Sequence, residues 1–169
     1  MSGSAPLAFV RLPEWALLPD FGLYMDQLLL FTGRVFPEGM LNPPLTPGMV
    51  NSYVKNGLID RPQGKKYSRV SLAQLLMLCC LKQTSSMDSM KRLLHPSDAS
   101  GTEALYGRFR LELQRLSDSL CPDSGMTALD CALASAVYQQ ACRLRMDAGS
   151  APQTQQSDPT PTNFGEEAT

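Results

Sequence analysis

Basic and hydrogen-bonding side chains gather in one stretch of the chain, NSYVKNGLIDRPQGKKYSR, which runs from Asn51 to Arg69. Asn, Ser and Lys can donate hydrogen bonds to base edges, while Lys and Arg neutralise phosphate charge. The longer segment from Asn51 to His95 contains eight Lys or Arg and two acids, a net charge of +6. The whole chain carries −1, so the remaining residues carry −7. This asymmetry indicates a polyanion as the partner of the basic segment.

An amphipathic helix over residues 46–56 would position the first of these side chains. Thr46 suits the N-cap, Pro47 the first helical position and Gly57 the left-handed residue that follows a helix. The apolar side of this helix consists of Met49, Val50, Tyr53 and Val54. The opposite side is small, polar and free of acids, and it consists of Gly48, Asn51, Ser52 and Lys55. A helix that enters the DNA major groove needs such a side, because acids would repel phosphate and bulky groups would clash with base edges.

The residues after this helix, LIDRPQGKKY, predict a tight two-stranded hairpin around a proline–glycine turn. The cations that it would hold beside the helix are Arg61, Lys65, Lys66 and Arg69. In that position they would contact the phosphates that flank the groove. The alternative is that these cations form only a solvated surface, with Asn51 and Ser52 as ordinary exposed residues.

Two tyrosines in this region could each contact DNA or pack in the interior of the protein. The hydroxyl of Tyr53 could contact a phosphate, or its ring could pack in the core with the hydroxyl in water. Tyr67 is expected to pack against the hairpin and hold it, and it counts among the candidate DNA contacts.

The stretch LTPGMVNSYVKNGLIDRPQGKKYSRVSLAQLL resembles the MerR-type helix-turn-helix with its wing. The residues that carry this resemblance are Thr46, Tyr53, Lys55, Gly57–Ile59 and Tyr67–Ser68. The chain is more similar still to the bacterial domain-of-unknown-function family eighteen-thirty-six, over roughly Leu12 to Leu94. The motifs shared with that family lie at Leu23–Gln27, Leu45–Lys55 and Lys65–Ser68.

The resemblance implies an all-α fold, a MerR-like winged helix-turn-helix with a small two-stranded wing, followed by a C-terminal helical hairpin. The expected parts are a flexible N-terminal arm (1–12), the winged helix-turn-helix domain (13–95), the C-terminal hairpin (96–146) and a disordered acidic tail (147–169). Two features depart from the MerR pattern. About a dozen residues separate the first helix from the recognition helix, where MerR proteins have a short turn, and Asn51 stands where they usually have Arg.

We therefore expect a sequence-specific DNA-binding protein, a transcriptional regulator that reads the major groove with helix 46–56 and clamps phosphates with the 60–69 wing. Its expected partners are double-stranded DNA and a second copy, joined through the C-terminal helices. The candidate DNA contacts are Thr46, Gly48, Asn51, Ser52, Tyr53, Lys55, Arg61, Lys65, Lys66, Tyr67 and Arg69. The alternative is a non-enzymatic protein-interaction module on the same fold, favoured by a sequence pI of about 5.8. A smaller possibility is an apolar pocket for an effector within the helical hairpin.

Other classes of function find little support in the sequence. The five cysteines are odd in number, contain no CxxC and are accompanied by one histidine, His95, so neither a disulfide framework nor a metal site is expected. No nucleophile elbow or phosphate-binding loop is present, and we expect neither an enzyme nor a cofactor. The longest apolar stretch, Leu75 to Leu81, is far shorter than the ~20 residues that cross a bilayer. No signal peptide is recognisable, so a cytoplasmic location is expected.

Overall fold

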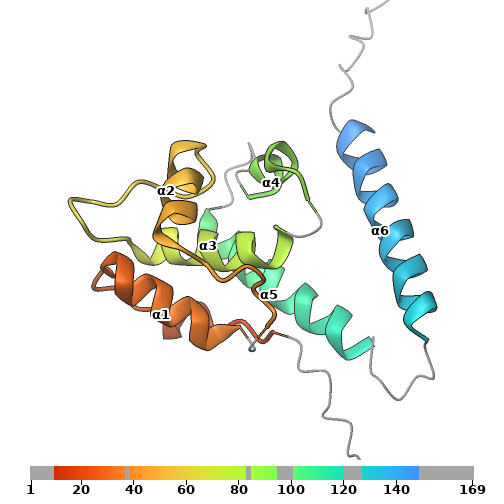
Figure 1. Ribbon diagram of the computed structural model, residues 1–169, viewed down its shortest axis with the longest axis horizontal. Coiled ribbons are helices and arrows are strands. Elements are labelled where there is room, and N and C mark those ends of the chain that lie inside the picture. Colours follow the sequence, from red (N-terminus) through yellow and green to blue (C-terminus); the bar gives the residue numbers. More distant parts are fainter. Residues whose placement is uncertain (1–9, 37–38, 83–84, 95–100, 120–126, 149–169) are drawn as a thin grey trace, which may run out of the picture. The chain divides into compact units, whose positions relative to one another are not determined.

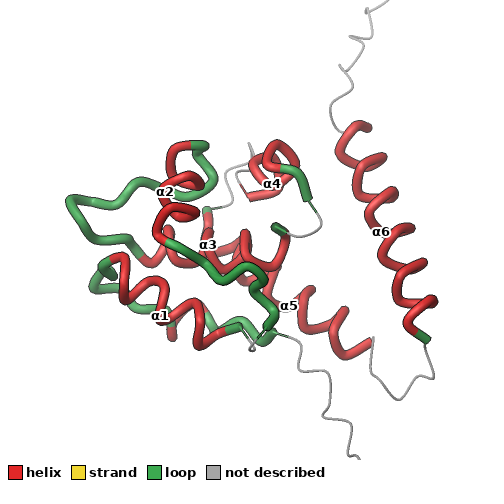
Figure 2. Tube along the Cα trace, in the orientation of Figure 1, coloured by secondary structure: helices red, strands yellow, loops and turns green. Residues whose placement is uncertain are grey.

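The computed structural model describes residues 10–36, 39–82, 85–94, 101–119 and 127–148. These residues form the helices η1 (Trp15–Leu17), α1 (Met25–Val35), α2 (Pro47–Lys55), α3 (Arg69–Leu81), α4 (Met87–Leu94), α5 (Thr102–Ser119) and α6 (Ala128–Ala148) (Figure 1). They contain no extended strand (Figure 2), so the expectation of an all-α chain is confirmed. The chain divides into two compact units, Met1–Ala132 and Leu133–Thr169, and the second contains most of α6. None of the helices in these ranges is long and apolar enough to cross a membrane.

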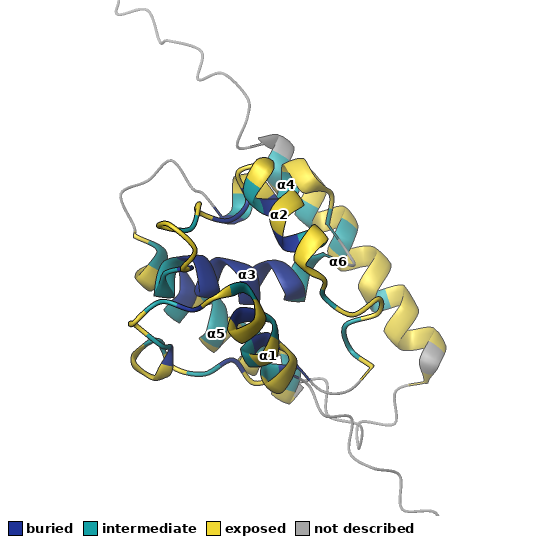
Figure 3. Ribbon diagram, turned by 60° about the vertical axis from the view of Figure 1, so that its left-hand side comes forward, coloured by how far each residue is buried: buried dark blue, intermediate teal, exposed yellow. Residues whose placement is uncertain are grey.

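Helix α3 is the centre of the first unit. Its residues from Ser71 to Cys79 are all buried, and Figure 3 shows this helix in the colour of buried residues. A helix that is apolar on every side must be covered on every side, and α3 is packed against both α4 and α5. Ser68 caps it, because its Oγ accepts a hydrogen bond from the backbone N–H of Ser71 at 3.2 Å.

The segment before α1 contacts Tyr106 of α5 at two residues, Pro13 and Trp15. Tyr106 of α5 is fully buried and donates a 2.9 Å hydrogen bond from its hydroxyl to the carbonyl of Pro13. Its ring lies 5.9 Å from that of Trp15. Val10 and Leu12, at the end of the segment expected as a flexible arm, are also buried, and residues 1–9 of that arm lie outside the described residues.

The expected two-stranded wing is absent from the described residues, and a tight turn takes its place. One antiparallel bridge closes this turn, with the backbones of Gln63 and Lys66 exchanging hydrogen bonds of 2.9 and 3.1 Å. The next residue, Tyr67, pairs instead with Leu23 through hydrogen bonds of 2.8 and 2.9 Å. Hydrogen-bonded and non-hydrogen-bonded pairs alternate in an antiparallel ladder, so the next pair to exchange hydrogen bonds would be Arg61 and Ser68. Ser68 is instead the N-cap of α3, and its carbonyl accepts a hydrogen bond from the N–H of Leu72, so the hairpin ends after one bridge.

Helices α5 and α6 form where the C-terminal helical hairpin was expected. The connection between them includes residues 120–126, which lie outside the described residues, and most of the expected acidic tail does as well. On α6, the apolar residues Leu129, Leu133, Val137 and Leu144 are each more than half exposed.

Candidate nucleic-acid interface

The outer side of α2 is polar and exposed, as its periodicity predicts. Thr46 begins the helix, with its Oγ1 accepting a hydrogen bond from the N–H of Met49 at 3.3 Å. Val50 is fully buried, which fixes the rotation of the helix on the core. The residues on the exposed side are Gly48, Asn51, Ser52 and Lys55. Four donors or small residues at these spacings form one continuous strip along the helix.

Asn56 is a polar residue that the sequence analysis missed. It is exposed, follows the last residue of α2 and donates from Nδ2 to the carbonyl of Ser52 at 2.8 Å and to its Oγ at 3.4 Å. The Ser52 hydroxyl, which accepts from Asn56, therefore keeps its proton free to donate elsewhere. The sequence signal that could have predicted this contact is an Asn that stands four residues after a Ser at the end of a helix.

The basic turn begins at a residue that α3 holds in place. The buried Gln74 accepts a 2.8 Å hydrogen bond from the N–H of Asp60 at its Oε1, and the hydroxyl of Ser71 donates to the carbonyl of Asp60 at 3.3 Å. Gly64 has φ +62°, the left-handed conformation that lets the turn close. The position of the turn is thus fixed by side chains of α3 rather than by a strand ladder.

The cations of this turn differ in their surroundings. Arg61 and Lys65 are exposed, as is Lys55 of α2, and none of the three has a hydrogen bond or ion pair within the described part of the chain. Lys66 is exposed, but its ammonium lies 5.4 Å from the centroid of the Tyr24 ring. Arg61 and Lys65 are therefore the turn's freest cations, and Lys66 is partly held by a cation–π contact.

Arg69 is placed differently from the cations of the turn. Its Nη2 lies 3.3 Å from Oδ2 of Asp20, and its guanidinium carbon lies 5.9 Å from the centroid of the Trp15 ring. Its Nε is buried and has no hydrogen-bond partner among the described residues. These contacts tie the segment before α1 to the start of α3, so part of the guanidinium is already engaged.

Both candidate tyrosines belong to the core. Tyr53 is 8% exposed and Tyr67 is 4% exposed. Burial, with a smaller contribution from the neighbouring Cys79, raises the pKa of Tyr53 above its ordinary 10.0, and burial alone raises the pKa of Tyr67. Their rings fix α2 and the basic turn on the core, whatever their hydroxyls contact.

Helix α4 adds a cation at the end of α2. Gly57, with φ +70°, ends the α2 turn, and a Cβ placed on it would lie 3.7 Å from Nζ of Lys91. Lys91 is exposed. Lys91 contributes to the charge of the basic segment but was not predicted as a site residue, because nothing local in the sequence indicates that α4 lies beside the end of α2. Lys82, by contrast, is engaged, since its ammonium donates to the carbonyl of Pro43 at 3.4 Å.

Within the described ranges, no group of three or more His, Cys, Asp or Glu side chains is placed to hold a metal ion. The candidate interface consists of the outer strip of α2, the basic turn that follows it in the chain, and Lys91, which lies beside Gly57 at the end of α2. These groups are hydrogen-bond donors and cations, which suit base edges and phosphates.

Comparison with known proteins gives a family but no function. The family model described as Domain of unknown function (DUF1836) matches residues 13–109, more than half of the chain, so the chain belongs to this family. No curated protein and no solved structure matches the chain.

Proposed function

We propose that this member of the DUF1836 family is a sequence-specific DNA-binding protein that regulates transcription. In this proposal the DNA-binding part is a MerR-like winged helix-turn-helix whose wing is reduced to the turn after α2. Helix α2 enters the major groove, with Asn51, Ser52 and Lys55 toward base edges. Arg61, Lys65 and Lys66 contact flanking phosphates. Acting on chromosomal DNA, the protein would work in the cytoplasm without catalysing a reaction.

The single observation that supports this proposal most is the exposed, acid-free strip of α2, with positive charge following its C-terminal end. The basic turn follows the helix in the chain, and Lys91 reaches its end from α4. A recognition helix needs donors that can turn toward base edges and cations that hold its register on the backbone. A merely solvated helix face requires neither the absence of acids nor a cation contributed by another helix.

We further propose that two copies bind together through their C-terminal helices. One helix in one groove binds weakly, and dimers gain affinity by binding two half-sites ~34 Å apart. The exposed apolar residues Leu129, Leu133, Val137 and Leu144 supply an apolar stripe on α6 that a second copy can cover.

The proposal is tested by titrating the full chain against a library of genomic DNA fragments over a range of salt concentrations. Log affinity should fall steeply with log salt, by ~0.9 for each phosphate contacted. Lys65→Ala and Lys91→Ala should each weaken binding to all sequences alike and reduce that slope by about one contact. Asn51→Ala should change which sequences are preferred. Arg34→Ala, which removes an exposed cation at the end of α1, is the matched control and should leave the slope unchanged.

A salt response close to flat, or an unchanged sequence preference in Asn51→Ala, would contradict the proposal. The alternative function, a protein-interaction module that docks an acidic partner through the same basic surface, is favoured by the sequence pI of about 5.8. Pull-down before and after nuclease treatment separates the two, because partners bridged by DNA are lost with nuclease and direct protein partners remain.

A further inference from the structure

A hollow of about 470 Å³ opens between α3, α4 and α5, within the first unit of the chain. Its walls are largely apolar. Among the side chains that line it are Leu81, Leu94, Phe109 and Leu113. Its volume lies within the ~300–1,000 Å³ typical of small-molecule sites. Neither the basic turn nor α2 contributes to its lining.

Two charged residues interrupt the apolar wall that α5 supplies. Arg108 and Glu112 line the hollow on the same side of the helix as Leu105, Phe109 and Leu113. These positions are spaced by three and four residues, so they form a single stripe. On an ordinary packing face such positions would be apolar, whereas here the exposed Arg108 brings a guanidinium to the wall of the hollow.

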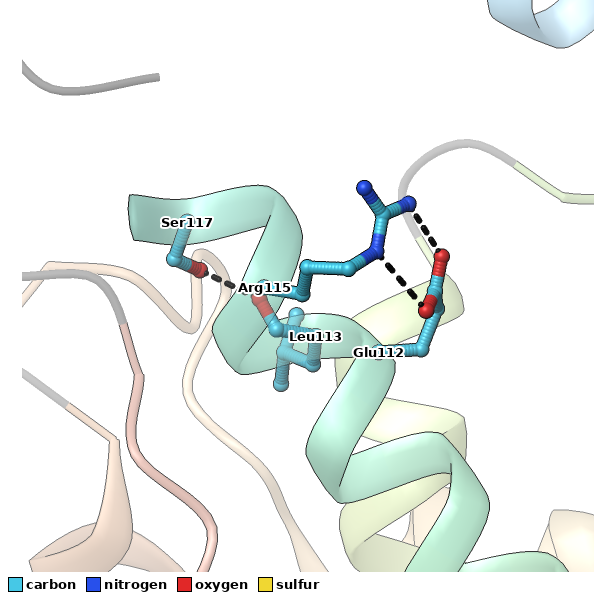
Figure 4. Close-up of polar contacts among 4 residues, drawn as sticks. All are labelled: Glu112, Leu113, Arg115 and Ser117. Carbon is cyan, nitrogen blue, oxygen red and sulfur yellow. Dashed lines mark hydrogen bonds and ion pairs between the residues drawn. The ribbon is translucent and has the colours of Figure 1, made fainter. Parts of the chain in front are cut away.

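The carboxylate of Glu112 is already occupied. Arg115 donates to both of its oxygens, from Nε at 3.0 Å and from Nη2 (Figure 4). This hydrogen bonding holds the pKa of Glu112 below its ordinary 4.5. The pairing neutralises the one acid on the wall and fixes it toward Arg115, one turn further along α5.

Arg108 is left without such a partner. Its side chain makes no hydrogen bond or ion pair within the part of the chain that the structure describes, although Glu112 stands four residues further along the same helix, at a spacing that often pairs. The hollow therefore combines an apolar body with one uncompensated guanidinium at its wall.

We propose that this hollow binds a small organic carboxylate with an aliphatic or aromatic body. The body packs among Leu81, Leu94 and Phe109, and the carboxylate accepts hydrogen bonds from the guanidinium of Arg108. The planar guanidinium matches a carboxylate with two parallel N–H···O bonds. A ligand cation would meet like charge at this place, and an uncharged ligand would leave the guanidinium without a partner.

Three probes with a straight chain of ten carbons, counting the carboxyl carbon of decanoate, test this site on the full chain without DNA. They are decanoate, decanol and decyltrimethylammonium, each titrated by calorimetry below its micelle concentration. Decanoate should bind at least about tenfold more tightly than the other two, a difference of about 1.4 kcal/mol. Arg108→Gln should remove this preference while decanol binding stays the same. Leu116→Trp, which adds bulk at the wall of the hollow, should weaken all three probes.

The matched control is Arg110→Gln, which removes the same charge from the same helix at a residue that does not line the hollow and that lies 3.4 Å from Glu14. It should leave decanoate binding unchanged. Arg115→Gln should weaken decanoate binding, because it releases Glu112 to pair with Arg108. Because Arg108 is exposed, Arg108→Gln is expected to fold, and a thermal melt verifies this.

Equal affinities for the three probes, or an unchanged preference in Arg108→Gln, would overturn the proposal and leave only unspecific apolar binding. Absence of binding by all three probes would also overturn it, and would mean that another apolar segment of this chain or of a second copy covers the hollow. Neither result bears on DNA binding, which is measured separately.

Discussion

The side-chain oxygen of Gln74 accepts a 2.8 Å hydrogen bond from the backbone N–H of Asp60. Gln74 is 1% exposed and stands in the middle of the apolar helix α3, where a polar side chain requires a partner. Asp60 is the residue at which the basic turn begins. The hydrogen bond therefore explains why a polar residue stands in the middle of α3, and it fixes the start of the turn relative to the core.

Gln74→Met should lower the free energy of unfolding by ~1–3 kcal/mol, because it keeps the bulk of the side chain but leaves the Asp60 N–H without its partner. Urea unfolding followed by circular dichroism measures the change. Gln114→Met, at an exposed position of α5, is the control and should stay within ~0.5 kcal/mol of the parent. An equally small effect at Gln74 would mean that the hydrogen bond does not stabilise the turn.

Two glycines in different backbone conformations give opposite predictions. Gly57 has φ +70°, so Gly57→Ala places a side chain in the left-handed region and should cost ~1–2 kcal/mol of stability. Gly107 lies inside α5, and a Cβ there would meet nothing within 4 Å, so Gly107→Ala should stabilise the protein by ~0.5–1 kcal/mol. Thermal and urea unfolding of the two variants check the signs. A stable Gly57→Ala would show that α2 can end without this turn.

The parts of the fold that depend on local signals could be predicted from the sequence. Thr46, Pro47 and Gly57 mark the ends of α2, and the apolar run from Leu75 to Leu81 predicts that this part of α3 is buried. The outer strip of α2 followed from a period of 3.6 residues and one apolar side. These inferences required no knowledge of what lies next to each helix.

The parts that depend on contacts between distant residues could not be predicted. The predicted two-stranded wing was wrong: its hairpin ends after one bridge, and Tyr67 pairs with Leu23, far earlier in the chain. Arg69 was grouped with the turn because of its sequence position, whereas Asp20 and Trp15 engage it from the segment before α1. Lys91 was missed because only the placement of α4 brings it to Gly57.

The adjacent cysteines of α3 predict how stability depends on pH. Burial raises the pKa of both Cys79 and Cys80 from 9.0 to about 12. In the unfolded chain these thiols lose their protons as the pH passes about 9, while in the folded chain they keep them, so the unfolded state binds fewer protons. The stability that they contribute is fully present below pH 9 and is lost as the pH rises toward 12.

Urea unfolding at several values between pH 8 and pH 10, below the range in which tyrosines dominate, measures this slope. Each of the two thiols should make the free energy of unfolding fall by up to a further ~1.4 kcal/mol per pH unit once the thiol ionises in the unfolded chain. Cys79→Ala should flatten the slope even though it lowers stability at every pH by creating a cavity. Cys131→Ala, at an exposed thiol of α6, should leave the slope as it is. A parent protein whose free energy of unfolding does not change with pH in this range would contradict the raised pKa values of the buried Cys79 and the partly buried Cys80.

The ion pair between Asp20 and Arg69 allows a test of whether Arg69 reaches DNA. The Asp20 side chain is 77% exposed and that of Arg69 is 26% exposed, so the pair should contribute no more than ~1 kcal/mol to stability. Asp20→Asn leaves the guanidinium in place on Trp15 but frees its charge. A phosphate contact by Arg69 would then raise the DNA affinity several-fold and steepen the slope of log affinity against log salt by ~0.9.

Asp26→Asn, which removes an exposed acid from the first turn of α1, is the matched control, since it changes the net charge equally without freeing a cation. Equal effects of the two variants would mean that Arg69 holds the segment before α1 to α3 and makes no contact with DNA.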